Sequence, residues 1–196
     1  SGESQNELPL YKVENQQYIH YGKGSVVLYS LQDYIGEDKV NLALKSFLEE
    51  FRYKEPPYPT SNDFLRHLDP HVPDSMKYLV DDLFKKITLY DYRMKEASLK
   101  MQGEQYEVTM TFEARKMYAD TMGIETSAQL HEWVDVGVFA DEDREDLIAY
   151  KRIYVDEENM EYTMYVDRKP LKAAIDPRRV VIERIIKDNV LTIKEE

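Results

Sequence analysis

The segment from Tyr18 to Gly36 places two glycines around a lysine, in the order Gly22-Lys23-Gly24-Ser25, at the start of an apolar run. These residue types suggest a phosphate-binding loop, in which successive backbone N–H groups surround a phosphate. That loop requires a preceding buried strand and the order G-x-x-x-x-G-K-[ST]. Here the first glycine of that order is missing, and the preceding stretch YKVENQQY is polar. The sequence therefore does not predict phosphate binding at this lysine.

Metal binding is the second chemistry to test, because histidines and carboxylates occur close together in two places. His131-Glu132 begins HEWVD, which differs from the zinc motif H-E-x-x-H in its fifth residue, Asp135. The motif needs a helix, whereas this segment alternates like a strand, in which residues i and i+4 lie roughly 13 Å apart. His67 and His71 surround a proline at a predicted helix end. We expect His131 on a strand surface and predict no metal site.

Nucleophilic catalysis has no sequence support. The chain has no cysteine, and no G-x-S-x-G elbow is present. The numerous carboxylates follow the pattern of solvated faces. We accordingly expect a pair such as Asp81-Asp82 to lie at the surface rather than to act as an acid–base pair.

The first half of the chain, from about Tyr18 to Ile87, has a helical hydrophobic period. In EDKVNLALKSFLEEF (37–51), the apolar residues recur at i, i+3, i+4 and i+7, which predicts an amphipathic helix. Gly36 suits the end of the preceding helix because glycine tolerates a left-handed backbone. Three prolines between 56 and 59 break the pattern, and TSND from Thr60 resembles a capping box. We predict four helices, the last one within DSMKYLVDDLFKKI (74–87).

From about Tyr90 the period changes to two. Tyr106, Val108, Met110 and Phe112 fall on one face of the strand pattern, with polar residues on the other. Several such stretches with short connections predict an antiparallel β-sandwich. The tail IDPRRVVIERIIKDNVLTI (175–193) fits either a turn and edge strand or a short helix, and we favour the former. The predicted fold class is α+β, with a helical segment followed by an antiparallel β-sandwich.

The composition argues against two classes of binding partner. The 196-residue chain carries a net charge of −12 without a basic block, which argues against nucleic acid and against an anionic membrane surface. No apolar run reaches the roughly 18–20 residues of a membrane span, so we expect no membrane insertion. The chain begins Ser1-Gly2, and we interpret residues 1–10 as disordered or a tag remnant.

Tyr21-Gly22-Lys23-Gly24, read as Y-x-K-G before an apolar helix, a glycine turn and a second helix, resembles the aminopeptidase N-type zinc metallopeptidases, the gluzincins. Later segments resemble a bacterial subgroup in which this module follows an ABC-type transporter permease in one polypeptide. They are FRYKEPPYPTSNDFLRHL, LVDDLFKKITLYDYRMKEAS and IDPRRVVIERIIKDNV. In that family the tyrosine donates a hydrogen bond to the oxyanion of the tetrahedral intermediate. A phenol suits this role because it stays protonated at neutral pH.

The resemblance implies a C-terminal fragment whose residues 11–90 end a peptidase catalytic domain and whose residues 91–196 form the β-sandwich. Tyr21 would be its catalytic residue. Zinc is expected only in the parent, because H-E-x-x-H and the downstream glutamate ligand are missing here, so the chain alone should be inactive. Its expected partners are the upstream catalytic domain and, in the parent, a peptide substrate; the parent is expected to be membrane-anchored in a bacterium. The alternative is a non-enzymatic β-sandwich interaction module of a membrane-linked assembly.

The same resemblance gives the lysine and glycines of the motif ordinary structural roles. The two glycines are expected to allow close backbone packing at the start of the helix, and Lys23 is expected to pair with a nearby carboxylate. In this interpretation the chemistry of the segment rests on Tyr21 alone.

Overall fold

The structure, a computed structural model, describes residues 7–13, 16, 18–183 and 185–195. The chain divides into two compact units: a helical unit of residues up to 88 together with 118–125, and a β-sandwich unit of residues 89–117 and 126–196. The segment 1–10, expected to be disordered or a tag remnant, lies mostly outside the described residues. Its last residue, Leu10, begins a short 3-10 helix, η1 (Leu10–Lys12).

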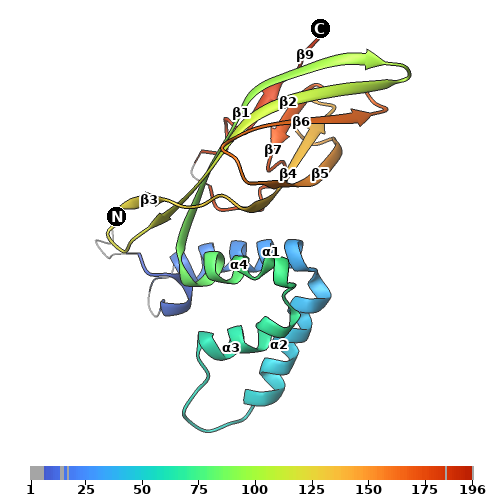
Figure 1. The fold of residues 1–196 in the computed structure, drawn as a ribbon. Coiled ribbons are helices and arrows are strands. Elements are labelled where there is room, and N and C mark those ends of the chain that lie inside the picture. Colours follow the sequence, from blue (N-terminus) through green and yellow to red (C-terminus); the bar gives the residue numbers. More distant parts are fainter. Residues whose placement is uncertain (1–6, 14–15, 17, 184, 196) are drawn as a thin grey trace. The chain divides into compact units, whose positions relative to one another are not determined.

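The helical unit contains four α-helices within the described residues (Figure 1). They are α1 (Gly24–Ile35), α2 (Glu37–Phe51), α3 (Ser61–Leu68) and the single turn α4 (Tyr78–Val80). Single turns precede and follow them. These are the π-helical η2 (Tyr18–Lys23) and η5 (Asp81–Lys85) and the 3-10 turns η3 (Asp69–His71) and η4 (Asp74–Met76).

Local sequence signals set the helix ends. Gly36 separates α1 from α2 with φ 98°, a backbone conformation that favours glycine. At the start of α3, the predicted capping box is present: the Thr60 backbone N–H donates to Asp63 Oδ2 over 2.8 Å. Helix α2 covers the segment predicted for it, because its apolar stripe buries Val40 and Ala43.

The β-sandwich consists of two sheets that are mostly antiparallel. The first has the order β3-β2-β1-β9, with β6 also paired to β2, and the second has the order β5-β4-β7-β8. Its longest strands are β1 (Ile87–Gln102), β2 (Gln105–Ala119), β4 (Glu132–Phe139), β5 (Leu147–Val155) and β6 (Asn159–Val166). The shorter strands are β3 (Glu125–Ser127), β7 (Lys172–Ile175), β8 (Val190–Thr192) and β9 (Lys194–Glu195).

One hydrophobic core joins the two sheets. Val108, Met110 and Phe112 of β2 are buried, and Val134 and Val136 of β4 belong to the same cluster. The alternating face predicted for β2 therefore points into the sandwich, as a strand with one buried face requires. The predicted fold class, helices followed by a β-sandwich, is confirmed.

The tail forms turns and edge strands rather than a helix. After β7, the chain turns at residues 176–179, and β8 then pairs antiparallel with β7. The final strand, β9, pairs parallel with β1 at Ser98 and Leu99. In the part of the chain that the structure describes, no helix combines the length and apolar character needed to cross a membrane.

Candidate functional site

Tyr21 lies in η2, the π-helical turn that leads into α1, and 75% of its surface is exposed. The turn itself is well held, since Ile19 is completely buried and its backbone N–H donates to the carbonyl of Gln16 over 3.0 Å. Gln16 is also buried, and its Oε1 accepts the backbone N–H of Leu8 over 3.3 Å. The phenol of Tyr21 therefore projects into solvent from an anchored backbone.

Lys23 fixes the other side of the same turn. Its side chain is mostly buried, and Nζ lies 2.8 Å from Glu7 Oε1. The expected pairing of Lys23 with a carboxylate is thus present. In a phosphate loop the lysine would instead face the phosphate, whereas here its ammonium group contacts Glu7. The hydroxyl of Ser25 also has a partner within this segment, because it donates to the carbonyl of Gly22 over 2.9 Å.

The expectation that Gly22 and Gly24 allow close backbone packing is wrong. A Cβ at Gly22 would meet nothing within 4 Å. A Cβ at Gly24 would lie 3.6 Å from the Ile19 carbonyl oxygen and 3.9 Å from Leu10 Cδ1, which are ordinary van der Waals distances. Neither glycine has a positive φ, so the geometry of the turn does not require glycine at these two places.

Helix α1 is apolar on more than one face. Val27, Leu31 and Ile35 follow one another at four-residue spacing and are buried. On other faces, Val26 and Leu28 are 37% and 38% exposed and Tyr29 is 52% exposed. A helix that is apolar around most of its circumference is usually buried on all sides. We use the name α1 apolar face for the exposed apolar side chains of this helix, which lie on more than one side of it, together with Tyr21, which precedes it: Tyr21, Val26, Leu28 and Tyr29.

The histidines whose side chains the structure describes do not gather into a metal site. His131 precedes β4 and is exposed, with its ring stacked on Tyr154 at 6.2 Å between centroids. Its neighbour Glu132 is buried and pairs with the buried Lys116. Within the residues that the structure describes, no group of three or more His, Asp or Glu side chains is arranged to hold a metal ion. These residues do not fit a zinc ion.

Asp82 corrects one sequence expectation. Asp81 is partly exposed, with 51% of its side chain accessible, but Asp82 is buried. Its carboxylate accepts the hydroxyl of Tyr118 over 2.9 Å and lies 3.3 Å from Lys86 Nζ. Tyr118 stands at the end of β2, so this contact attaches residues 118–125 to the helices of the same unit. A buried carboxylate is stable there because each charge has a partner.

Sequence reasoning also missed a polar chain between α2 and α3. His67 Nδ1 lies 2.9 Å from Ser46 Oγ, and His67 Nε2 lies 2.7 Å from Glu50 Oε2. The hydrogen bond from Arg66, with a further one from His67, lowers the pKa of the Glu50 carboxyl. Ser46 Oγ also bonds to the Ala43 carbonyl over 3.0 Å inside α2. Ser46 is thereby held to its own helix, and we interpret this series of hydrogen bonds as a connection between α2 and α3.

Comparisons with known proteins find similarity among solved structures only. No protein-family model matches this chain, and no curated protein matches it either. Among solved structures, the chain matches Legionella pneumophila aminopeptidase A, crystallised in complex with aspartic acid, with a TM-score of 0.47 and 11% identity. The match covers 86% of this chain and 18% of that chain. The chain thus spans less than a fifth of the length of this structural neighbour.

Proposed function

We propose that this chain is the C-terminal part of a zinc-dependent aminopeptidase-like protein, to which it contributes Tyr21 as the oxyanion-stabilising hydrogen-bond donor. The proposal rests on the Y-x-K-G resemblance. The single structural observation that supports it is the exposure of the Tyr21 phenol on an anchored turn. A donor that acts on a substrate bound to another part of the protein must be accessible from its own chain, as this phenol is.

The α1 apolar face supports the same proposal. Large exposed apolar patches commonly mark interaction sites, and here exposed apolar side chains of α1 follow Tyr21 closely in the chain. We propose that the upstream catalytic domain of the same polypeptide covers this face. The zinc, its ligands and the general base would all belong to that upstream part, because the described residues of this chain do not fit a metal ion.

A Tyr21→Phe variant of the intact parent tests the proposal. It removes the hydroxyl and keeps the ring, so kcat for peptide hydrolysis should fall about 10²–10³-fold while KM changes little. Tyr29→Phe is the matched control, because it deletes an exposed hydroxyl from the same apolar face and should leave kcat unchanged. An unchanged kcat in Tyr21→Phe would overturn the catalytic assignment.

The isolated chain provides the second arm. With zinc added, it should hydrolyse no fluorogenic aminopeptidase substrate. Hydrolysis by the isolated chain would contradict the proposal, because it would require a complete active site here. If the parent itself has no peptidase activity but depends on the α1 apolar face for assembly, the interaction-module alternative replaces the enzyme proposal.

A further inference from the structure

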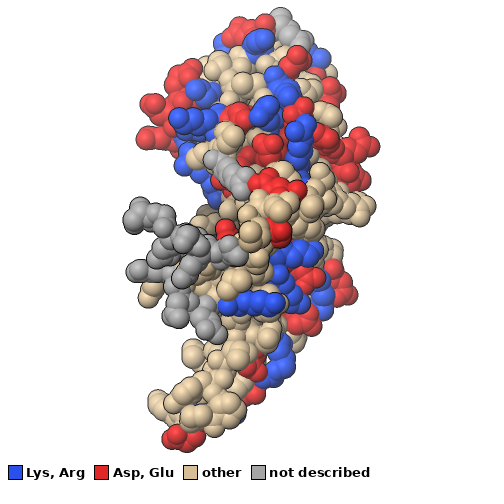
Figure 2. All heavy atoms as spheres, turned by 90° about the vertical axis from the view of Figure 1, so that its left-hand side faces the viewer, with Lys and Arg blue, Asp and Glu red and all other residues tan. Residues whose placement is uncertain are grey.

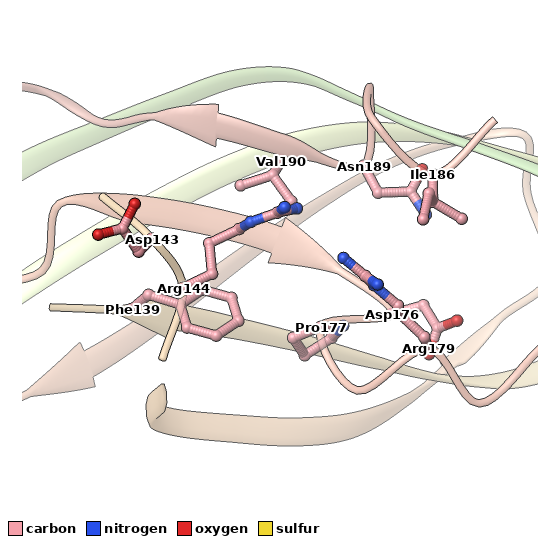
Figure 3. A pocket seen from close by; sticks show the side chains of 9 residues that line it. All are labelled: Phe139, Asp143, Arg144, Asp176, Pro177, Arg179, Ile186, Asn189 and Val190. Atoms are coloured by element: carbon pink, nitrogen blue, oxygen red, sulfur yellow. The ribbon is translucent and has the colours of Figure 1, made fainter. Parts of the chain in front are cut away.

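A cavity of about 170 Å³ lies in the β-sandwich unit, beside the turn that follows β7 (Figure 3). Its wall is more polar than apolar. The apolar lining residues are Phe139, Pro177, Ile186 and Val190. The polar ones are Asp143, Arg144, Asp176, Arg179 and Asn189. The cavity thus brings several polar groups together beside a smaller apolar surface.

Two arginines of this cavity have no partner for their charge among the described residues. In Figure 3, the guanidinium groups of Arg144 and Arg179 extend toward each other from two segments of the chain. Neither side chain forms an ion pair or hydrogen bond with any residue that the structure describes. The adjacent Arg178, by contrast, is paired with Asp135 and lies 4.3 Å from the Tyr150 ring centroid. In a chain of net charge −12, it is unusual for two cations at one cavity to have no described carboxylate partner.

The backbone at the cavity is also unusual. Arg144, Asp176 and Arg179 have φ values of 65°, 45° and 56°. Side chains other than glycine seldom adopt this left-handed region, and such residues cluster at ligand-binding sites. Apart from these three, Tyr53 is the one other non-glycine residue with positive φ in the described part of the chain. The strained positions are therefore concentrated at this cavity.

Two carboxylates hold the strained turns in place. Asp141 accepts the backbone N–H of Glu145 over 3.0 Å and that of Asp146 over 3.0 Å, which fixes the loop carrying Arg144. Asp176 accepts the backbone N–H groups of Val180 and Val181 over 2.8 and 3.2 Å, which fixes the turn carrying Arg179. The carboxylate of Asp176 is thus used by the backbone. Asp143 lies at the far end of the cavity from Arg179 in Figure 3.

Asn189 supplies an unused acceptor. Its side chain is buried, and its Nδ2 donates to Glu183 Oε2 over 2.5 Å. Its Oδ1 has no hydrogen-bond partner in the structure. An unsatisfied buried acceptor is costly, so a ligand that brings a donor to this oxygen would gain affinity.

We propose that this cavity binds a small organic carboxylate that carries a short apolar side chain and a hydrogen-bond donor on the carbon beside the carboxylate. The planar guanidinium groups of Arg144 and Arg179 match a carboxylate in shape and charge. The donor would reach Asn189 Oδ1, and the side chain would contact Phe139, Ile186 and Val190. Two sources share this chemistry: a free α-hydroxy acid and the C-terminal residue of a peptide.

A larger cavity in the same unit lacks these properties. It measures about 460 Å³, and Arg115, Lys116 and Glu158 help to line it. Both of its cations are already paired, Arg115 with Glu158 and Lys116 with Glu132. The proposed site is therefore distinguished not by its size but by two arginines that have no partner among the described residues.

The test is a heteronuclear NMR titration of the full 196-residue chain at neutral pH. The probes are α-hydroxyisocaproate for the free acid and N-acetyl-leucine for a peptide C-terminus, with isocaproate and inorganic phosphate as comparators. We expect saturable shifts at residues 139–146 and 176–190 for at least one probe, with a Kd on the order of 1 mM or tighter. Isocaproate lacks the donor and should bind about threefold to tenfold more weakly. Phosphate lacks the apolar part and should bind more weakly still.

Arg144→Gln and Arg179→Gln should each weaken binding of the better probe about tenfold or more, because each removes a charge-assisted hydrogen bond. Lys151→Gln is the matched control; it removes one positive charge from an exposed position outside the cavity and should change the Kd less than twofold. All three variants should keep the thermal unfolding midpoint of the parent chain. Phosphate binding as tight as that of the probes would overturn the proposal in favour of a simple anion site. Equal affinities in the arginine variants, or no saturable shifts with any probe, would overturn it altogether.

Discussion

The two units of this chain differ in how many charged side chains they bury. Among the described residues, Asp82 is the one buried charged residue of the helical unit, whereas the β-sandwich buries Glu107, Lys116, Glu132, Asp135 and Asp176. The helical unit instead exposes apolar side chains on α1. On the face shown in Figure 2, acidic and basic side chains are closely intermixed over the upper part, which belongs to the sandwich. Buried ion pairs such as Lys116 with Glu132 therefore lie mainly in the sandwich, and the helical unit has a single buried carboxylate among its described residues.

Asp135 shows how the sandwich manages a buried charge. Its carboxylate accepts Arg152 Nε and Nη2 over 2.8 and 3.0 Å, and Arg178 Nε over 3.1 Å. The three residues come from β4, β5 and the turn after β7. One carboxylate therefore connects two strands and the turn that carries Arg179, which makes the ion cluster part of the framework of the proposed cavity.

The largest effect should come from breaking this cluster. Asp135→Ala leaves two largely buried guanidinium groups without their carboxylate, and we expect a loss of about 3–5 kcal/mol in the free energy of unfolding. Urea denaturation followed by the fluorescence of Trp133, the single tryptophan, which lies in β4, measures it.

The control is Glu49→Ala in α2. Glu49 faces Lys45 at 4.0 Å, with both side chains largely exposed, so the change should stay within about 0.5 kcal/mol. A cost below about 1 kcal/mol for Asp135→Ala would show that the cluster contributes little, and the contrast between the units would lose its energetic meaning.

The sequence predicted those features that depend on neighbours along the chain. The bounds of α2, the capping box of Thr60 and Asp63, and the inward face of β2 all follow from local spacing. The Asp135 cluster could not be predicted, because Asp135 and Arg178 lie 43 positions apart and meet only through the pairing of β4 with β7. The cavity arginines gave no signal for the same reason, since Arg144 and Arg179 belong to separate loops.

The candidate site was predicted only in part. The sequence singled out Tyr21 through a resemblance, and the structure adds that its side chain is exposed on an anchored turn. The buried Asp82 was misjudged because its partner Tyr118 arrives from the end of β2, far along the chain. Such contacts depend on the path of β2, which local patterns do not contain.

The second prediction concerns pH and should affect the sandwich alone. Burial raises the pKa of Asp176 from its ordinary 3.8 to about 6, and burial likewise raises that of Glu183 from 4.5 to about 7. Between the unfolded and folded pKa values, the folded chain binds more protons than the unfolded one. Stability must therefore fall as pH rises through this window.

From about pH 5 to about pH 8, Asp176 alone should cost about 1.4 kcal/mol, since pH 5 lies about one unit below its folded pKa. Urea midpoints from Trp133 fluorescence at several pH values measure the slope. Glu183→Gln keeps an oxygen for the Tyr92 backbone N–H, which Glu183 Oε1 now accepts over 2.6 Å, and should reduce the slope. A stability that rises with pH over this range would contradict the assigned directions.

The smallest expected effect on the free energy of unfolding concerns helix α1 of the helical unit. If the α1 apolar face exists for a partner and not for the fold, Leu28→Gln and Tyr29→Gln should each change the free energy of unfolding by less than about 1 kcal/mol, because both side chains are partly exposed and glutamine is a good helix former. Leu31→Ala, at a fully buried position of the same helix, should cost about 2–5 kcal/mol. The helical signal in circular dichroism during urea denaturation measures all three.

Losses above about 2 kcal/mol for Leu28→Gln and Tyr29→Gln would mean that these residues belong to the core of the helical unit, and the apolar face would no longer support a covering domain. Small losses together with weaker self-association in sedimentation analysis would show that this surface promotes association but is dispensable for folding, as an interface for a separate domain should be.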